Sequence, residues 1–182
     1  ALPIYRAYVV PAGNAPDFLP RLKEICQKEK VDAVISVVDE ELTHVLQLEA
    51  MGIVVIQPRI EFVEFSLDKL HCMRALRAAG INAPQTWLVN EIPVDVAYPL
   101  FVKPRVGRGS RGCGKVNSQD ELKTFVAASS YTPDHLLAQT FADGTEYTVS
   151  VMVWRDGEVQ AVVPKQIISK VGVTKAAVTR SN

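Results

Sequence analysis

The sequence predicts a mixed helix-and-strand protein in two parts: a parallel α/β part over residues 1–62 and an α+β part with antiparallel strands over 63–182. In the first part, short β-branched runs alternate with helical patterns, which favours parallel strands. In the second part, glycine-containing turns join strand to strand. The composition, with 48% hydrophobic and 22% charged residues, is typical of a globular protein.

The first part opens with a strand–helix–strand pattern. Residues 5–10 and 31–38 are short β-branched runs, and Asn14 and Pro16 are start signals for a helix between them. The apolar residues of that helix recur at helical spacing: Phe18, Leu19, Leu22, Ile25 and Cys26. This arrangement is a βαβ unit.

A second helix and another strand complete the first part. Asp39 is expected to cap the helix, which Gly52 ends before a strand at 53–57. Strands that alternate with helices in this way predict a parallel, Rossmann-like sheet. Three acids, Asp39, Glu40 and Glu41, lie at the carboxyl end of the expected strand 31–38, a position where ligands often bind. The alternative interpretation is that they complement the dipole of the helix that follows.

The second part begins with a helix that Ser66 is expected to cap and Gly80 to end. Strands are expected at 84–89 and 98–103. A glycine-rich stretch then leads to another strand at 115–116, so the glycines join strand to strand.

After that strand, Ser118 is expected to cap a helix over 119–128. Strand-like runs follow at 135–141 and 146–154, and Asp156-Gly157 predicts a hairpin turn into a further strand. The second part is therefore α+β with antiparallel character.

Residues 101–116, FVKPRVGRGSRGCGKV, contain four glycines and five cations without an acid. This pattern indicates a site for a multiply charged anion. Gly107, Gly109 and Gly112 fit G-x-G-x-x-G, but the dinucleotide motif must open a helix and here a strand follows. The overlapping P-loop match fails because Val116 replaces the Ser or Thr that should meet magnesium.

The remaining possibility is a flexible glycine flap between two antiparallel strands, which offers backbone N–H groups to phosphates. Lys103 lies on the strand before this flap, and strand alternation puts Phe101 on the same face. The plainer interpretation is a mobile surface hairpin with solvated cations.

Further residues fit a nucleotide site when taken in order. Lys69 can supply a second phosphate contact, and the Gln139 amide can address a purine edge. The main chain at Thr140 and Ala142 can address adenine N6 and N1, and Glu146 can accept from ribose hydroxyls. Each residue alone has an ordinary structural explanation.

Taken together, these pieces resemble the ATP-grasp superfamily, specifically its carbamoyl-phosphate-synthase-like and carboxylate–amine ligase members. The resemblance rests on the ordered segments SLDKLHCMRAL, GINAPQTWLV, YPLFVKP, the glycine loop and QTFADGTEYTV. It implies a Rossmann-like pre-ATP-grasp domain over 1–62 and an ATP-grasp fold over 63–182.

The resemblance also implies roles for single residues. Lys103 contacts the α- and β-phosphates and Lys69 approaches phosphate from the other side of the cleft, so these two are the catalytic candidates. Lys165 holds an anionic substrate or the γ-phosphate, and Glu146 binds ribose. The implied ATP-binding set is Lys69, Lys103, Gly107, Gly109, Ser110, Arg111, Gly112, Gly114, Gln139, Thr140, Phe141, Ala142, Glu146 and Lys165.

Magnesium is the second implied cofactor, but the sequence departs from the family here. Family members hold it on a late acid followed by an E-x-N element, whereas the acids after Glu146 are Asp156 and Glu158 only, and the last residue is Asn182. We therefore predict no metal ligand in the chain and expect Mg²⁺ ligands outside it. With the first βα unit apparently missing, the expectation is an excerpt of a longer protein.

The activity implied by the resemblance is an ATP-dependent ligase, in which ATP phosphorylates a carboxylate to an acyl phosphate that an amine attacks. The alternative is a non-catalytic or degenerate regulatory nucleotide-binding module, and a weaker one is an NAD-type oxidoreductase. The expected partners are a small-molecule carboxylate and an amine acceptor, with a homodimer common in such families.

Other partners and compartments are disfavoured by charge and pattern. Twenty basic and twenty acidic residues give a net charge of zero, which argues against nucleic acid. No apolar run approaches the ~20 residues of a membrane span and no signal segment opens the chain, so a cytoplasmic location without membrane is expected. Three cysteines without a CxxC pair suggest neither disulfides nor zinc.

Overall fold

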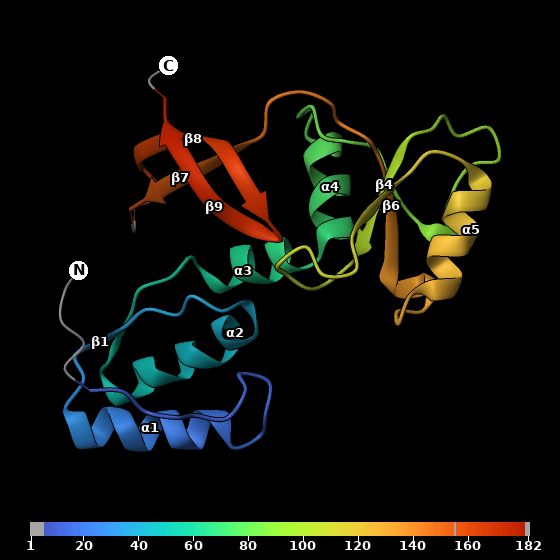
Figure 1. Cartoon of the computed structure of the whole chain (residues 1–182). Coiled ribbons are helices and arrows are strands. Elements are labelled where there is room, and N and C mark those ends of the chain that lie inside the picture. Colours follow the sequence, from blue (N-terminus) through green and yellow to red (C-terminus); the bar gives the residue numbers. More distant parts are fainter. Residues whose placement is uncertain (1–5, 155, 181–182) are drawn as a thin grey trace. The chain divides into compact units, whose positions relative to one another are not determined.

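The computed structural model of the protein describes residues 6–154 and 156–180 (Figure 1). The chain divides into two compact units, residues 1–72 and 73–182. Both mix helices with strands, as the sequence predicts. The expected domain boundary near residue 62 stays a prediction.

The first unit contains a parallel pair of short strands, β1 (Ala33–Val34) and β2 (Val54–Val55). Their ladder includes bonds from Val54 N–H to Asp32 C=O and from Ile56 N–H to Val34 C=O. Helical segments connect the two strands, so the predicted parallel βαβ character is confirmed here.

The core of the first unit forms between helix α1 (Phe18–Glu29) and the segments around β2. Helix α1 forms as predicted and ends at Lys30, whose left-handed backbone lets its N–H bond back to the last turn. The buried residues of this core are Phe18, Cys26, Val45, Leu48, Ile53 and Val55.

Two expectations for the first unit are wrong. Residues 6–10 form no strand; instead, Arg6 and Tyr8 both donate to the Glu29 carboxylate at the end of α1. Residue 5 of the expected strand lies outside the described residues. Polar contacts with the helix therefore replace strand pairing for this segment.

The helix expected after Asp39 is broken into three short pieces. These are a 3-10 turn (Asp39–Glu41), helix α2 (Leu42–Val45) and a second 3-10 stretch (Leu46–Met51). Asp39 provides no side-chain cap because it is already inside the first turn. The end at Gly52 is confirmed, since its φ of 78° suits glycine.

Two helices follow, α3 (Ile60–Leu67) and α4 (Lys69–Ala78). Ser66 lies inside α3 and donates to the Val63 carbonyl, so the prediction that it caps the following helix is wrong. Asp68 caps α4 instead: its Oδ1 accepts from Leu70 N–H at 3.1 Å and His71 N–H at 3.2 Å.

The second unit begins its strands with a four-stranded antiparallel sheet in the order β3-β6-β4-β5. The strands are β3 (Thr86–Leu88), β4 (Leu100–Pro104), β5 (Gly114–Val116) and β6 (Leu136–Thr140). The glycine-rich stretch joins β4 to β5, so the predicted strand-to-strand connection is confirmed.

One face of this sheet packs against helix α5 (Gln119–Ala128). Ser118 caps α5 as predicted, with its Oγ accepting from Glu121 N–H, and the Glu121 carboxylate accepts from Asn117 N–H in return. Short 3-10 turns flank the sheet at Val89–Glu91 and Pro133–His135. The buried residues of this core are Leu100, Val102, Val116, Leu122, Leu136 and Ala138.

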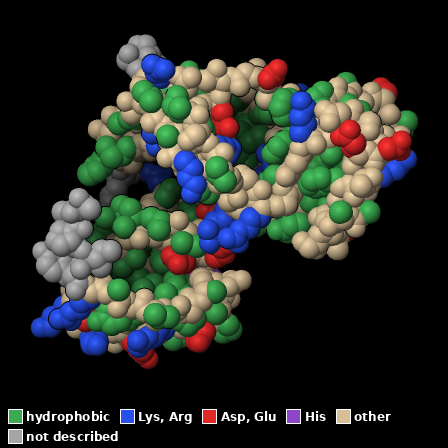
Figure 2. All heavy atoms as spheres, in the orientation of Figure 1, with side chains coloured by type: hydrophobic (Ala, Val, Ile, Leu, Met, Phe, Trp, Pro, Cys, Tyr) green, Lys and Arg blue, Asp and Glu red, His purple; other side chains and the backbone are tan. Residues whose placement is uncertain are grey.

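The chain ends in a three-stranded antiparallel sheet of β7 (Tyr147–Val153), β8 (Val159–Val171) and β9 (Val173–Thr179). The hairpin at Asp156 and Gly157 joins β7 to β8, and Gly172 turns the chain into β9. Hydrophobic and basic side chains are both visible over this sheet (Figure 2), and β7 and β9 are exposed along their length.

Candidate functional site

Lys103 lies on the sheet face opposite the α5 core. Along β4, burial alternates: Leu100, Val102 and Pro104 are buried, whereas Phe101 and Lys103 are half-buried. The predicted shared face of Phe101 and Lys103 is therefore confirmed. The cation lies away from the apolar core and can meet a ligand on this face.

The Lys103 ammonium is held by a chain of side-chain hydrogen bonds. Lys103 Nζ donates to Gln139 Oε1 at 2.8 Å, and Gln139 Nε2 donates to Thr86 Oγ1 at 2.8 Å. Thr86 Oγ1 in turn donates to the Pro84 carbonyl at 3.0 Å. Gln139 and Thr86 are only 7% and 6% exposed, so the amide and the hydroxyl of this network are buried, whereas Lys103 is half-buried. It fixes which end of the Gln139 amide faces the lysine.

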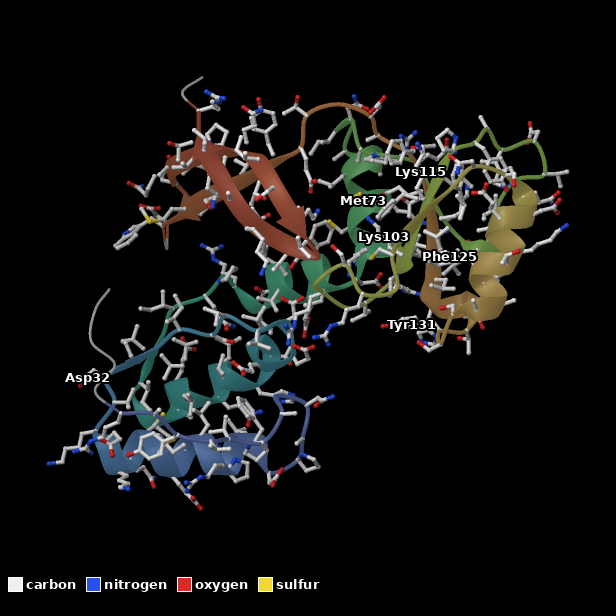
Figure 3. All side chains as sticks on the ribbon, viewed as in Figure 1. Asp32, Met73, Lys103, Lys115, Phe125 and Tyr131 are labelled. Atoms are coloured by element: carbon white, nitrogen blue, oxygen red, sulfur yellow. The ribbon has the colours of Figure 1, made fainter. Side chains whose placement is uncertain are left out.

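The same face carries a second lysine that the sequence analysis did not select. Lys115 on β5 pairs with Phe101 on β4, which pairs with Gln139 on β6, so these three residues form one row across the sheet. The Lys115 ammonium lies 4.4 Å from the centroid of the Phe141 ring. Figure 3 shows Lys103 and Lys115 on this sheet, with Phe125 on the neighbouring α5.

The glycines between β4 and β5 serve two different purposes. Gly107 and Gly109 have φ values of 128° and 70°, and a Cβ on either would meet open space. A Cβ on Gly112 would lie 3.0 Å from the Tyr131 ring, and one on Gly114 would lie 2.6 Å from the Phe125 ring. The first two therefore give a pliable, accessible backbone, and the last two allow close packing.

The tip of the glycine loop touches the turn between β8 and β9. Ser110 Oγ donates to the Gly172 carbonyl at 2.7 Å, and a Cβ on Gly172 would lie 3.2 Å from the Gly109 carbonyl oxygen. Ser110 has a φ of 56°, a left-handed conformation that costs a non-glycine residue on the order of 1 kcal/mol. Its hydroxyl hydrogen bond offsets part of that cost.

Some hydrogen-bonding groups of the predicted adenine-binding segment, residues 139–142, are already bonded to other groups of the protein. Thr140 N–H donates to Gln85 C=O, and Phe141 N–H donates to Pro99 C=O at 3.4 Å. Both ends of the Gln139 amide are used by Lys103 and Thr86, as described above. The amide thus positions a lysine in this structure, and its contact with a purine edge stays a prediction, as does that of Ala142.

The remaining candidates lie on or beside the last sheet. The Glu146 carboxylate accepts from Lys170 Nζ at 2.5 Å. Lys165 on β8 lies between Thr148 on β7 and Thr179 on β9 and is half-buried. Their predicted roles toward ribose and phosphate stay predictions.

Lys69 is the first residue of α4 and belongs to the first compact unit. Its neighbour Asp68 caps the helix, so the Asp-Lys pair has a local structural role. Its predicted phosphate contact is not tested. Arg111 is exposed in the glycine loop, and its predicted contact stays a prediction too.

The described part of the chain holds no group of three or more His, Cys, Asp or Glu side chains placed to bind a metal ion. Magnesium in nucleotide sites is usually held by one or two carboxylates together with substrate phosphates, so the location of its ligands stays a prediction and no chemical step is assigned to it. Of the described helices, none has the length and apolar character needed to cross a membrane.

The fold and the site define the second unit as an α+β domain in which a glycine-rich loop joins two antiparallel strands and a lysine is held on the strand before the loop. A comparison with protein families identifies the family of this domain. The ATP-grasp domain family matches residues 66–176, more than half of the chain, and the PylC-like N-terminal domain family matches residues 5–56. The chain belongs to the ATP-grasp family.

Similar curated proteins include ligases of amino acids. A D-alanine–D-alanine ligase of Corynebacterium aurimucosum is 32% identical over 109 residues, which cover 56% of this chain and 31% of the relative. The vancomycin/teicoplanin A-type resistance protein VanA of Enterococcus faecium is 31% identical over 108 residues, covering 57% of this chain and 32% of the relative. The matched region spans about a third of the length of these relatives.

Solved structures share the fold at low sequence identity. The L-amino acid ligase of Bacillus licheniformis matches with a TM-score of 0.68 at 17% identity, covering 95% of this chain and 43% of that one. The carboxyaminoimidazole ribonucleotide synthase of Aspergillus clavatus, solved with ATP, matches with a TM-score of 0.68 at 21% identity, covering 95% and 45%. These matches support the predicted ATP-grasp fold with its preceding domain.

Sequence reasoning missed Lys115 and Thr86. Lys115 was visible as one of five cations in 101–116, but its face depends on the register of β5 against β4, which the sequence does not show. Thr86 is an ordinary strand residue until the Gln139 amide is placed beside it.

Proposed function

We propose that this chain binds ATP on the face of the β3-β6-β4-β5 sheet opposite the α5 core. The phosphates would lie between Lys103 and the loop at residues 107–112, and the adenine along residues 140–142. The observation that carries the proposal is the Lys103–Gln139–Thr86 network, in which a buried amide holds an ammonium group on the strand that enters a pliable glycine loop.

We further propose that the complete protein is a carboxylate–amine ligase. A carboxylate oxygen attacks the γ-phosphorus of ATP, a new O–P bond forms, and the bond between the β-phosphate oxygen and the γ-phosphorus breaks to release ADP. The amine nitrogen then attacks the acyl carbon, and phosphate leaves as the C–N bond forms and the nitrogen loses a proton. The ligase names of the relatives support this class.

In this proposal the chain positions phosphates and neutralises their charge. Phosphoryl transfer needs positioning and electrostatic stabilisation more than covalent help from the protein. Lys103 supplies a fixed cation, and backbone N–H groups of the glycine loop supply further donors. Lys165 is proposed to face the γ-phosphate or the anionic substrate.

Ribose binding at Glu146 requires a change of partner. Its carboxylate is bound to Lys170 in this structure, and both side chains are partly exposed. An exposed ion pair contributes roughly 0–1 kcal/mol, so ribose hydroxyls can displace Lys170 at little cost. The substrates proposed are a small carboxylate and an amine; the relatives leave open which ones.

The test compares Lys103→Met with Lys123→Met. Lys123 lies on α5, is paired with Asp120, and is 68% exposed on its side chain, so it is a matched lysine outside the proposed site. Calorimetry should show ATP binding that Lys103→Met weakens by about tenfold or more, as expected for a lost charge-assisted contact, while Lys123→Met leaves it unchanged.

Activity is measured as ADP release in the longest chain that the gene encodes, with amino acids as trial carboxylates and amines. Release that depends on both substrates supports the ligase. ATP binding without ADP release would favour the non-catalytic nucleotide-binding module. Equal ATP affinity in the wild type and in Lys103→Met would refute the assigned site.

A further inference from the structure

The glycine loop between β4 and β5 is anchored at both of its ends by the segment that joins α5 to β6. At the entrance to the loop, Arg105 N–H donates to the His135 carbonyl at 2.9 Å. At the exit, a Cβ on Gly112 would lie 3.0 Å from Tyr131 Cε2 and 3.3 Å from Pro104 Cγ. The backbone at Gly112 is therefore packed tightly against both an aromatic ring and the end of β4.

The exit of the loop differs in this respect from its middle. Gly112 has a φ of 66°, in the left-handed region that favours glycine, and a methyl group there would also press on the Tyr131 ring. Gly107 and Gly109 have positive φ values too, but a Cβ on either would meet no atom within 4 Å. The middle of the loop therefore has room to move, whereas its exit is held in place.

Two aromatic rings hold the exit, and they differ in their relation to the core. Phe125, whose ring packs against Gly114, belongs to the apolar core between α5 and the sheet. Tyr131 follows α5 and is 37% exposed (Figure 3), and its N–H donates to Ser129 Oγ at 3.1 Å. The Tyr131 ring can therefore be removed with less damage to the core than the Phe125 ring.

An anchored exit matters for a loop that has to close on an anion. When the N–H groups of a loop meet a phosphate, the backbone that carries them loses conformational freedom. Fixing the backbone of a single residue changes a binding constant by on the order of tenfold. A ring that already fixes the exit lowers this cost and restricts where the rest of the loop can reach.

We propose that Tyr131 is a positioning residue of the ATP site, whose ring fixes the exit of the glycine loop so that the N–H groups of the loop meet the phosphates. This inference rests on the proposed ATP site and assigns a role within it to a residue outside the nucleotide-facing strands. Because the ring acts through the loop, its effect should grow with the number of phosphates that the loop covers.

The test compares the affinities for ATP and AMP by calorimetry. AMP keeps the base, the ribose and one phosphate, so it makes fewer contacts with the loop. Tyr131→Ala should bind ATP about tenfold more weakly than the wild type, the cost of fixing about one more residue, and should bind AMP with unchanged affinity. Tyr131→Phe keeps the ring atoms that touch Gly112 and should match the wild type for both nucleotides.

Hydrogen exchange at saturating ATP gives a second readout. The loop amides at 107–112 should be protected in the wild type and in Tyr131→Phe, and should exchange about tenfold faster in Tyr131→Ala. Melting temperatures confirm folding, and Tyr131→Leu, which also lacks Cε2, replaces the alanine variant if that variant does not fold.

Two results would refute the inference. Equal weakening of ATP and AMP by Tyr131→Ala would show a general disturbance of the site. Unchanged affinity for both, with unchanged loop protection, would show that the ring does not position the loop. Absence of ATP binding by the wild type would instead overturn the proposed function itself.

Discussion

Replacing Gly114 by alanine should destabilise the second unit through a single clash. The added Cβ would stand 2.6 Å from Phe125 Cε2, 3.3 Å from Cδ2 and 3.5 Å from Cζ. The optimal separation of non-bonded carbon atoms is about 3.5–4.0 Å, so the Phe125 ring must move about 1 Å away from β5. Overpacking of this kind costs about 1–3 kcal/mol.

Thermal unfolding followed by circular dichroism measures the effect. A loss of 1–3 kcal/mol corresponds to a fall in melting temperature of roughly 2–12 °C for a chain of this size. Phe125→Leu removes Cε2, the atom that would lie 2.6 Å from the added Cβ. The double variant Gly114→Ala/Phe125→Leu should therefore be more stable than the sum of the two single changes by about 0.5 kcal/mol or more.

Gly107→Ala is the control for backbone strain. It introduces a side chain at a φ of 128° with no atom within 4 Å, so its cost should come from strain alone and add independently to that of Phe125→Leu. Strict additivity for Gly114→Ala with Phe125→Leu, or a neutral Gly114→Ala, would refute the packing argument.

Two further predictions concern polar groups. Gln139→Met should lower the free energy of unfolding, measured by urea titration, by about 1–3 kcal/mol, because Thr86 and Lys103 both lose a hydrogen-bond partner. The same change should weaken ATP binding. An unchanged ATP affinity would show that the amide does not position Lys103. Hydrogen bonds from Tyr8 and then Arg6 lower the pKa of Glu29. A lowered carboxyl pKa stabilises the fold above the unfolded value of about 4.3, and this contribution is lost as pH falls through the folded pKa. The melting-temperature gap between wild type and Glu29→Gln should therefore be widest near neutral pH and close below about pH 4; a gap independent of pH would contradict this.

Patterns within one element predicted most of the second unit. The alternation of Phe101 and Lys103, the Ser118 cap of α5 and the strand-to-strand role of the glycines depend on neighbours a few residues away. Such local preferences survive into the fold because nothing in the tertiary structure opposes them.

Predictions failed where distant contacts decide the outcome. Residues 6–10 have strand-like composition, but Arg6 and Tyr8 find Glu29 on α1 instead of a strand partner. Ser66 was predicted to cap the following helix, but α3 extends past it to Leu67, so Asp68 takes that position instead. Lys115 was missed for a related reason, since its face follows from a register with β4 that no local pattern reveals.

Gln139 also affects the thermodynamics of the proposed site before any ligand arrives. A lysine side chain carries about 2 kcal/mol of rotamer entropy, which a binding site normally loses when it closes on an anion. Because Lys103 is already held at 2.8 Å from a buried amide, part of that loss occurs during folding. This end of the site is preorganised, so an incoming phosphate meets a cation with little conformational freedom left to lose.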